Sequence, residues 1–186
     1  MQMPEPDAAI IAKRPEIIDQ LNRIVPGGPF GANVITDPDG LRAYECDGLS
    51  AYRQLPMVVV LPETTAQVSE ILKYCDDAGV KVVARGAGTS LSGGALPLAD
   101  GVMLGLGKFN KVLDIDYANR AVVTQPGVTN LAISEAVADH GFYYAPDPSS
   151  QIACSIGGNI AENSGGVHCL KYGTTTNNVL GVRAVF

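Results

Sequence analysis

The sequence has no tryptophan, no C-x-x-C pair among its cysteines, and no apolar run long enough to cross a membrane. Even the run Met57–Leu61 is far shorter than the ~18 residues that a membrane-spanning helix requires. The first six residues lack a basic region followed by an apolar run, so no secretory signal is expected. These absences favour a cytoplasmic protein whose four cysteines are free thiols rather than disulfides or zinc ligands.

Positive charge is also scarce. The 13 basic and 19 acidic residues give a net charge of −6, and no basic cluster is present. An acidic chain of this kind is a poor electrostatic match for nucleic acid.

Glycine, in contrast, is abundant, at 21 of 186 residues, beside a hydrophobic share of 46%. The hydrophobic share predicts a packed globular chain and excludes a disordered one. Eight of the glycines lie in two short segments, 85–94 and 155–166. Glycine leaves room for a ligand to approach the main chain closely, so these two segments are the candidate binding loops.

The order of the expected elements indicates a mixed α/β domain. Residues 1–14 are polar and contain proline, and we expect them to form a flexible N-terminus that precedes a folded domain over 15–186.

The runs 57–61 and 80–84 are continuous, apolar and β-branched, as in strands buried on both faces. A helix that starts at a capping box of Thr64 and Gln67, and stops at Gly79, lies between them. This order predicts a parallel pair of strands with a right-handed crossover. Further strands are expected at 101–106, 112–116, 121–125 and 179–186, with a helix at 129–139 closed by Gly141.

The first candidate loop, Arg85–Gly94, follows the second of these strands directly. Its exposed main-chain N–H groups and its hydroxyls could surround a diphosphate, although the same composition also suits a tight turn that binds nothing. The loop lacks the lysine of a Walker motif. Leu91 stands where the G-x-G-x-x-G motif has its third glycine, which disfavours an ordinary dinucleotide pocket and a nicotinamide cofactor.

The second candidate loop lies in the stretch from Tyr143 to Asn178, where helical and strand periodicity disappears. So long an irregular stretch is usually functional, or else contains short elements that the pattern does not reveal. Small residues here would let a flat polar ligand lie against the main chain. Asn159 and Asn163 are four residues apart and would share a face on a helical turn. The alternative is an ordered loop in which asparagines support turns.

Both loops together resemble the vanillyl-alcohol-oxidase-type flavoproteins. The resemblance rests on Arg85–Gly94, on Ser155–Gly166, and on the shorter pieces Lys171–Gly173 and Val179–Gly181 that continue it in order. Two short segments, Leu-Pro-Glu-Thr-Thr from Leu61 and Pro-Asp-Pro-Ser-Ser-Gln from Pro146, are similar in sequence to one branch of this family. That branch contains the FAD subunits of bacterial glycolate oxidases. D-lactate and D-2-hydroxyglutarate dehydrogenases are close relatives within that branch.

This resemblance implies an α+β fold, an FAD-binding PCMH-type domain of two α/β lobes with FAD between them. It implies that the first loop holds the FAD diphosphate through Arg85, Gly86, Ala87, Gly88, Thr89, Ser90, Leu91 and Ser92. Pro146, Asp147 and Ser149 would lie near the ribityl chain and the flavin. The flavin and adenine groove would be lined by Ser155, Ile156, Gly157, Gly158, Asn159, Ala161, Asn163, Gly165 and Gly166. Some relatives attach FAD through a histidine near the first loop, and this loop has none, so noncovalent FAD is expected.

The implied activity is oxidation of a small 2-hydroxy acid, with glycolate the favoured substrate. Family members continue past the position of Phe186 with the rest of the FAD domain and a cap domain that carries the substrate-binding arginine and any metal ligands. We therefore expect a truncated domain, name no catalytic residue and no metal ligand, and expect this chain alone to be inactive. The implied partners are a second flavin-domain subunit and an iron–sulfur subunit, through which the protein could associate peripherally with a membrane. A non-catalytic FAD-binding fragment remains the alternative, as does a D-lactate or D-2-hydroxyglutarate dehydrogenase.

The other titratable residues give weaker indications of a functional site. His140 precedes Gly141 at an expected helix end, where a solvated or helix-dipole role suits it. His168 lies in the second loop, and without a visible partner a structural role is favoured over a site role. Asp114 and Asp116 alternate on an expected strand and indicate a solvated face rather than a metal site.

Overall fold

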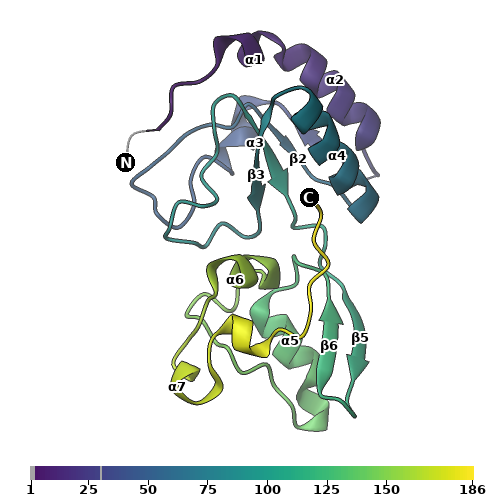
Figure 1. Cartoon of the computed structure of the whole chain (residues 1–186), viewed down its shortest axis with the longest axis vertical. Coiled ribbons are helices and arrows are strands. Elements are labelled where there is room, and N and C mark those ends of the chain that lie inside the picture. Colours follow the sequence, from purple (N-terminus) through teal and green to yellow (C-terminus); the bar gives the residue numbers. More distant parts are fainter. Residues whose placement is uncertain (1–2, 30) are drawn as a thin grey trace. The chain divides into compact units, whose positions relative to one another are not determined.

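The computed structural model describes residues 3–29 and 31–186, and the chain divides into two compact units (Figure 1). The first unit comprises residues 1–108 with 185–186, and the second comprises residues 109–184. Helices and strands occur in both units, so the expected mixture of α and β structure is confirmed. None of the helices in the described ranges has the length and apolar character needed to cross a membrane.

The first unit is built on a four-stranded sheet. Its strands are β1 (Val34–Ile35), β2 (Val58–Val60), β3 (Lys81–Arg85) and β4 (Gly101–Gly105), in the spatial order β1-β2-β4-β3. Strands β2, β4 and β3 run parallel, while β1 pairs antiparallel with β2. Its helices are α1 (Ala8–Ala12), α2 (Arg14–Ile24), α3 (Pro38–Arg42) and α4 (Thr65–Asp77).

Alternation along β2 divides the core of this unit between the two faces of the sheet. Val58 and Val60 pack in the larger cluster with residues of α2 and α4, two helices that lie side by side (Figure 1). Val59 points to the opposite face, where it packs with Met103 of β4 and Leu41 of α3. The run 57–61 is therefore apolar at every position because helices cover both faces of its strand.

The topology corrects two expectations. The runs 57–61 and 80–84 do form parallel strands, but β4 lies between them, so they are not a neighbouring pair. Strand β3 is consequently at the edge of the sheet. Lys81 and Ala84 on it are exposed rather than buried on both faces.

The second unit packs two helices against a hairpin. The hairpin strands are β5 (Val112–Asp116) and β6 (Ala121–Thr124), and the helical elements are α5 (Asn130–Val137), η1 (Ala138–His140), α6 (Ile156–Glu162), α7 (Cys169–Tyr172) and η2 (Thr175–Asn178). Val128, Ile133 and Ile156 form its core. The stretch from Tyr143 to Asn178 thus contains two short α-helices and a 3-10 turn, each too short for a periodic pattern.

Local capping signals are confirmed where they could be tested. Thr64 and Gln67 form both halves of a capping box at α4, and the Thr129 side chain accepts from the Ala132 amide at the start of α5. Gly141 ends that helical segment at φ 73°. The strand expected at 179–186 is wrong, since none of these residues lies in a strand. An extended segment becomes a strand only when another strand satisfies its N–H and C=O groups.

The N-terminal segment contains an element that the sequence analysis did not expect. Helix α1 lies within residues 1–14, with Asp7 as its N-cap, and the Asp7 amide donates to the Asp100 carboxylate at 2.9 Å. Residues 1 and 2 lie outside the described residues. The flexibility of this segment stays a prediction.

Candidate cofactor-binding site

The first glycine loop leaves the carboxyl end of β3 and presents a row of unused main-chain donors. Among the described residues, the amides of Gly86, Ala87, Gly88 and Thr89 donate to no protein acceptor. Gly88 lies at φ 69°, a left-handed conformation that suits glycine. Consecutive N–H groups without protein partners are the donors that a phosphate group accepts from. The loop is therefore suited to hold an anion.

Arg85 packs against this loop, and the Nη1 of its guanidinium donates to protein carbonyls. Its Nη1 donates to the carbonyl of Cys46 at 2.8 Å and to that of Ala95 at 3.4 Å, and its Cζ lies 5.6 Å from the centre of the Tyr44 ring. The side chain is buried, and this burial lowers the pKa of the guanidinium below its ordinary value. A Cβ on Gly88 would overlap the guanidinium, so loop and arginine are packed together.

The segment after α3 lies beside the same loop. A Cβ on Gly48 would lie 2.8 Å from the carbonyl oxygens of Thr89 and Ser90, so the two backbones touch. Asp47 is buried, and its Oδ1 accepts from the Leu49 amide at 2.9 Å. Its Oδ2 has no hydrogen-bond partner among the described residues. The single Asp-Gly pair at 47–48 was the only available signal, and it reads as an ordinary turn.

In the second unit, helix α6 carries the next group of expected site residues. Ser155 caps the helix by accepting from the Gly158 amide. Gly157 packs so closely on Pro126 that a Cβ would lie 2.7 Å from the proline ring. Ile156 points into the core, so only its main chain can face a ligand. Ala161 and Ser149, expected as contacts, are exposed.

Two buried asparagine side chains in this unit have unsatisfied polar atoms. Asn159 of α6 is 2% exposed and Asn130 of α5 is fully buried. The Nδ2 of Asn159 and the Oδ1 of Asn130 find no hydrogen-bond partner among the described residues. A buried polar atom without a partner costs about 1–3 kcal/mol, so such atoms commonly mark a place where a ligand completes the bonding. One is a donor and the other an acceptor, as a flavin or a ribityl chain would require.

Asn163 does not share a helix face with Asn159, contrary to the spacing argument. It leaves α6 at φ 50° in the left-handed conformation that ends the helix. Its Oδ1 accepts from the amide and the hydroxyl of Thr176, at 3.0 and 2.9 Å. The asparagine thus ties the end of α6 to η2, and its carbonyl oxygen is already in use.

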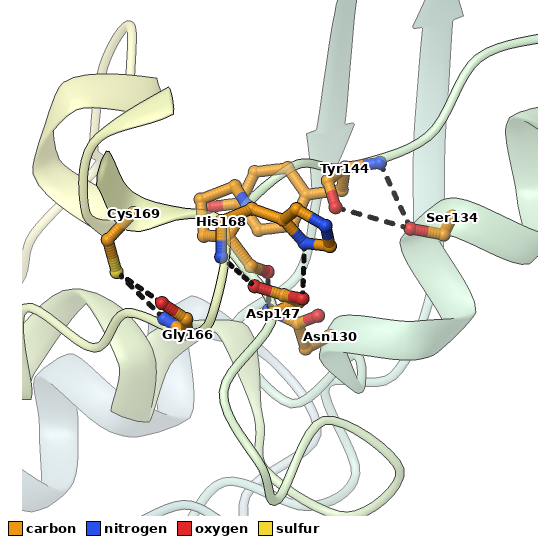
Figure 2. Close-up of polar contacts among 8 residues, drawn as sticks. Asn130, Ser134, Tyr144, Asp147, Gly166, His168 and Cys169 are labelled. Atoms are coloured by element: carbon orange, nitrogen blue, oxygen red, sulfur yellow. Dashed lines mark hydrogen bonds and ion pairs between the residues drawn. The ribbon is translucent and has the colours of Figure 1, made fainter. Parts of the chain in front are cut away.

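The expected contacts Asp147 and Gly166 meet in the structure, and His168 joins them (Figure 2). Gly166 lies against the main chain of Asp147, where a Cβ would overlap the Asp147 carbonyl oxygen. The Asp147 carboxylate reaches the His168 Nδ1 at 2.6 Å. The expectation that His168 lacks a partner is therefore wrong. The first loop belongs to the other unit, so the structure groups the site residues into two separate sets.

Comparison with known proteins identifies the family. Residues 56–186 match the family model described as FAD binding domain, and the chain belongs to this family. FAD is accordingly its cofactor. The donors of the first loop and the unsatisfied amides of Asn130 and Asn159 fit that group.

Three curated relatives are similar in sequence to this chain over most of its length. The chain is 56% identical over 167 residues to the glycolate oxidase subunit GlcD of Escherichia coli K12, which covers 90% of this chain and 33% of that protein. It is 42% identical over 146 residues to GlcD of Bacillus subtilis, covering 78% of this chain and 31% of that protein. It is 36% identical over 165 residues to the mitochondrial D-2-hydroxyglutarate dehydrogenase of Bos taurus, covering 89% and 29%. The chain thus spans about a third of the length of the curated relatives it matches.

A solved structure supports the fold independently. An alkyldihydroxyacetonephosphate synthase superimposes with a TM-score of 0.75 over 94% of this chain and 32% of that one, at 20% identity. At this identity the match concerns the fold alone. It supports the expected mixed α/β fold of the chain.

Proposed function

We propose that this chain is the FAD-binding portion of a flavin-dependent 2-hydroxy-acid oxidoreductase that oxidises glycolate to glyoxylate. The observation that carries the proposal is the 56% identity to a glycolate oxidase subunit, combined with the donor row of the first glycine loop. The substrate is proposed from that relative's name.

The residues of the first unit bind the diphosphate in this proposal. The amides of Gly86, Ala87, Gly88 and Thr89 donate to its oxygens, and the hydroxyls of Thr89, Ser90 and Ser92 add donors. Leu91, whose side chain is 70% exposed, contributes its main chain. Arg85 supports the loop from beneath through its bonds to the Cys46 and Ala95 carbonyls.

The residues of the second unit orient the flavin end of the cofactor in this proposal. Asn159 donates and Asn130 accepts, which would satisfy their unpartnered atoms. Pro146, Asp147 and Ser149 contact the ribityl chain. Gly157, Gly158, Gly165 and Gly166 line the groove with their main chains, beside Ser155, Ile156, Ala161 and Asn163.

FAD supplies the redox chemistry when bound: the carbon that bears the substrate hydroxyl gives up a hydride, and the hydroxyl gives up a proton. This chain's own residues bind and orient the cofactor. We assign no proton transfer to any of them. As partners of the complete protein we propose an iron–sulfur subunit, which would serve as the electron acceptor, and a second flavin-domain subunit in the same complex. Any association with a membrane is proposed to run through those subunits.

A substrate panel tests the reaction. The full-length protein, loaded with FAD, is mixed with glycolate, D-lactate or D-2-hydroxyglutarate and an artificial electron acceptor dye, and dye reduction is followed. Fastest reduction with glycolate is expected. Faster reduction with either other acid would replace glycolate as the substrate while leaving the reaction class intact, and no reduction with any of them would overturn the proposal.

One alternative is favoured by the extent of the chain, which spans about a third of its relatives. In that case the 186-residue chain by itself is a non-catalytic FAD-binding fragment. Turnover of glycolate by this chain alone would exclude the alternative. FAD binding without turnover would support it.

A further inference from the structure

Two segments of the second unit are joined by a side-chain pair that the family resemblance did not point to. The Asp147 Oδ1 accepts from the His168 amide at 3.3 Å, and its Oδ2 lies 2.6 Å from the His168 Nδ1 (Figure 2). Both carboxylate oxygens therefore bond to one residue that is 21 positions away in sequence. The pair ties the turn that contains Asp147 to the segment that leads into α7.

The same two segments also meet along their main chains. Gly166 packs on the Asp147 carbonyl, and its missing Cβ makes that approach possible. Next to this contact, the rings of Tyr143 and Tyr172 meet edge to face with centroids 6.2 Å apart. Asn130 also holds the turn, since its Nδ2 donates to the Pro146 carbonyl at 2.9 Å. The turn is thus fixed at Pro146 by α5 and at Asp147 by His168.

The electrostatic surroundings favour an ionised carboxylate. Burial opposes ionisation of Asp147, but the hydrogen bonds and charge of His168 hold the pKa of the carboxyl below its ordinary value. Lys171 lies over the Tyr172 ring at 5.0 Å. The other titratable groups of these segments are Tyr143, Tyr144, Cys169 and Tyr172. The side chain of Asp147 is 17% exposed and that of His168 is 58% exposed, so the bond between them can be removed without opening the core.

We propose that His168 is a positioning residue for the cofactor, which acts by fixing the Asp147 turn and with it the main chain of Pro146 to Ser149. This inference rests on the proposed function, in which the Asp147 turn contacts the ribityl chain of FAD. Both oxygens of Asp147 bond to His168, so the carboxylate stabilises the turn. The cofactor then contacts the main chain of the turn. His168 itself is not proposed to touch the cofactor.

The test compares variants that keep or lose the donor at the Nδ1 position. His168→Asn keeps a nitrogen donor near the place of Nδ1, His168→Gln moves the donor toward the place of Nε2, and His168→Ala removes it. His140→Ala is the matched control, since this other histidine of the same unit stacks on Tyr117 with centroids 4.0 Å apart. Each full-length apoprotein is titrated with FAD by fluorescence, its thermal unfolding is recorded, and the visible spectrum of its bound flavin is compared.

We expect His168→Ala and His168→Gln to raise the FAD dissociation constant about fivefold, as suits a partly exposed pair, and to alter the flavin band. His168→Asn and His140→Ala should bind FAD as the wild type does. The unfolding temperatures of the apoproteins should stay alike, which separates positioning from a general loss of stability.

Two results would overturn the inference alone: wild-type affinity in His168→Ala, or equally weak binding in His168→Ala and His168→Asn. Failure of the wild-type protein to bind FAD would instead overturn the proposed function, and this inference with it. The two failures are therefore distinguishable.

Discussion

Replacing Gly88 by alanine tests whether the first glycine loop is packed on Arg85. Gly88 lies at φ 69°, and a Cβ there would overlap the Arg85 guanidinium. Gly79, in the same unit, has nearly the same backbone conformation at φ 66°, but a Cβ there would meet nothing within 4 Å. The pair Gly88→Ala and Gly79→Ala therefore separates the cost of backbone strain from the cost of displacing the arginine.

The structure sets the expected magnitudes. Left-handed backbone costs an alanine about 1 kcal/mol, which is the whole effect expected for Gly79→Ala. In Gly88→Ala the guanidinium must also move away from the Cys46 and Ala95 carbonyls. Loss of a buried hydrogen bond from a charged group adds about 2 kcal/mol, which brings the expected loss to about 3 kcal/mol. For a chain of this size each kcal/mol lowers the unfolding temperature by roughly 3 °C.

The assay is urea unfolding of both variants beside the wild type, followed by circular dichroism, with thermal unfolding as a second measure. Gly88→Ala should be less stable than Gly79→Ala by about 2 kcal/mol, with an unchanged dependence on urea. Equal losses in the two variants would mean that Arg85 is not packed against the loop.

Three further predictions concern single sites. Gly166→Ala should lose about 2 kcal/mol of stability in urea unfolding, because its Cβ would overlap the main chain of Asp147; wild-type stability would contradict this. Burial raises the pKa of the Cys75 thiol to about 11, so Cys75 should resist a thiol reagent at pH 8 until the protein is unfolded, and modification of Cys75 in the native protein would oppose this. Asp100 is buried and bonds to the Lys81 Nζ at 2.7 Å. Burial opposes its ionisation, but the bonds from Lys81 and from the Asp7 amide lower its pKa. Its contribution to stability is therefore present at neutral pH and lost below about pH 4, so Asp100→Asn should flatten the pH dependence of unfolding there, and an unchanged slope would argue against it.

Local signals in the sequence predicted local structure well, because capping and strand-forming patterns depend on neighbouring residues. The Thr64 and Gln67 capping box is an example, as is the β-branched run that became β2. The position of β4 between β2 and β3 could not be predicted, since it depends on how the chain returns after the glycine loop. The strand expected at 179–186 failed for a related reason, because strand formation requires a partner that no local pattern supplies.

The candidate site was likewise predicted only in part from the sequence. Glycine clusters and hydroxyls pointed to two candidate segments, whose contacts with the cofactor stay a prediction, and the family match over residues 56–186 agrees with the FAD that the family resemblance implied. The bond between Asp147 and His168 joins residues 21 apart, and the support of the loop by Arg85 joins residues 39 apart, so neither was visible in the sequence. Asn159 was among the expected groove residues, but its burial and the buried amide of Asn130 were not visible in the sequence, as burial is a property of the folded chain.

The first glycine loop is proposed to hold the diphosphate of FAD, and a titration of the full-length apoprotein with FAD tests this role. Ala87 is exposed on that loop, so a substitution there should leave the fold intact. The wild type and Ala87→Ser are predicted to bind one FAD per chain with similar affinity. Ala87→Asp should bind at least about tenfold more weakly, because its carboxylate would repel the phosphates at close range. Equal FAD affinity in Ala87→Asp and Ala87→Ser would contradict the claim.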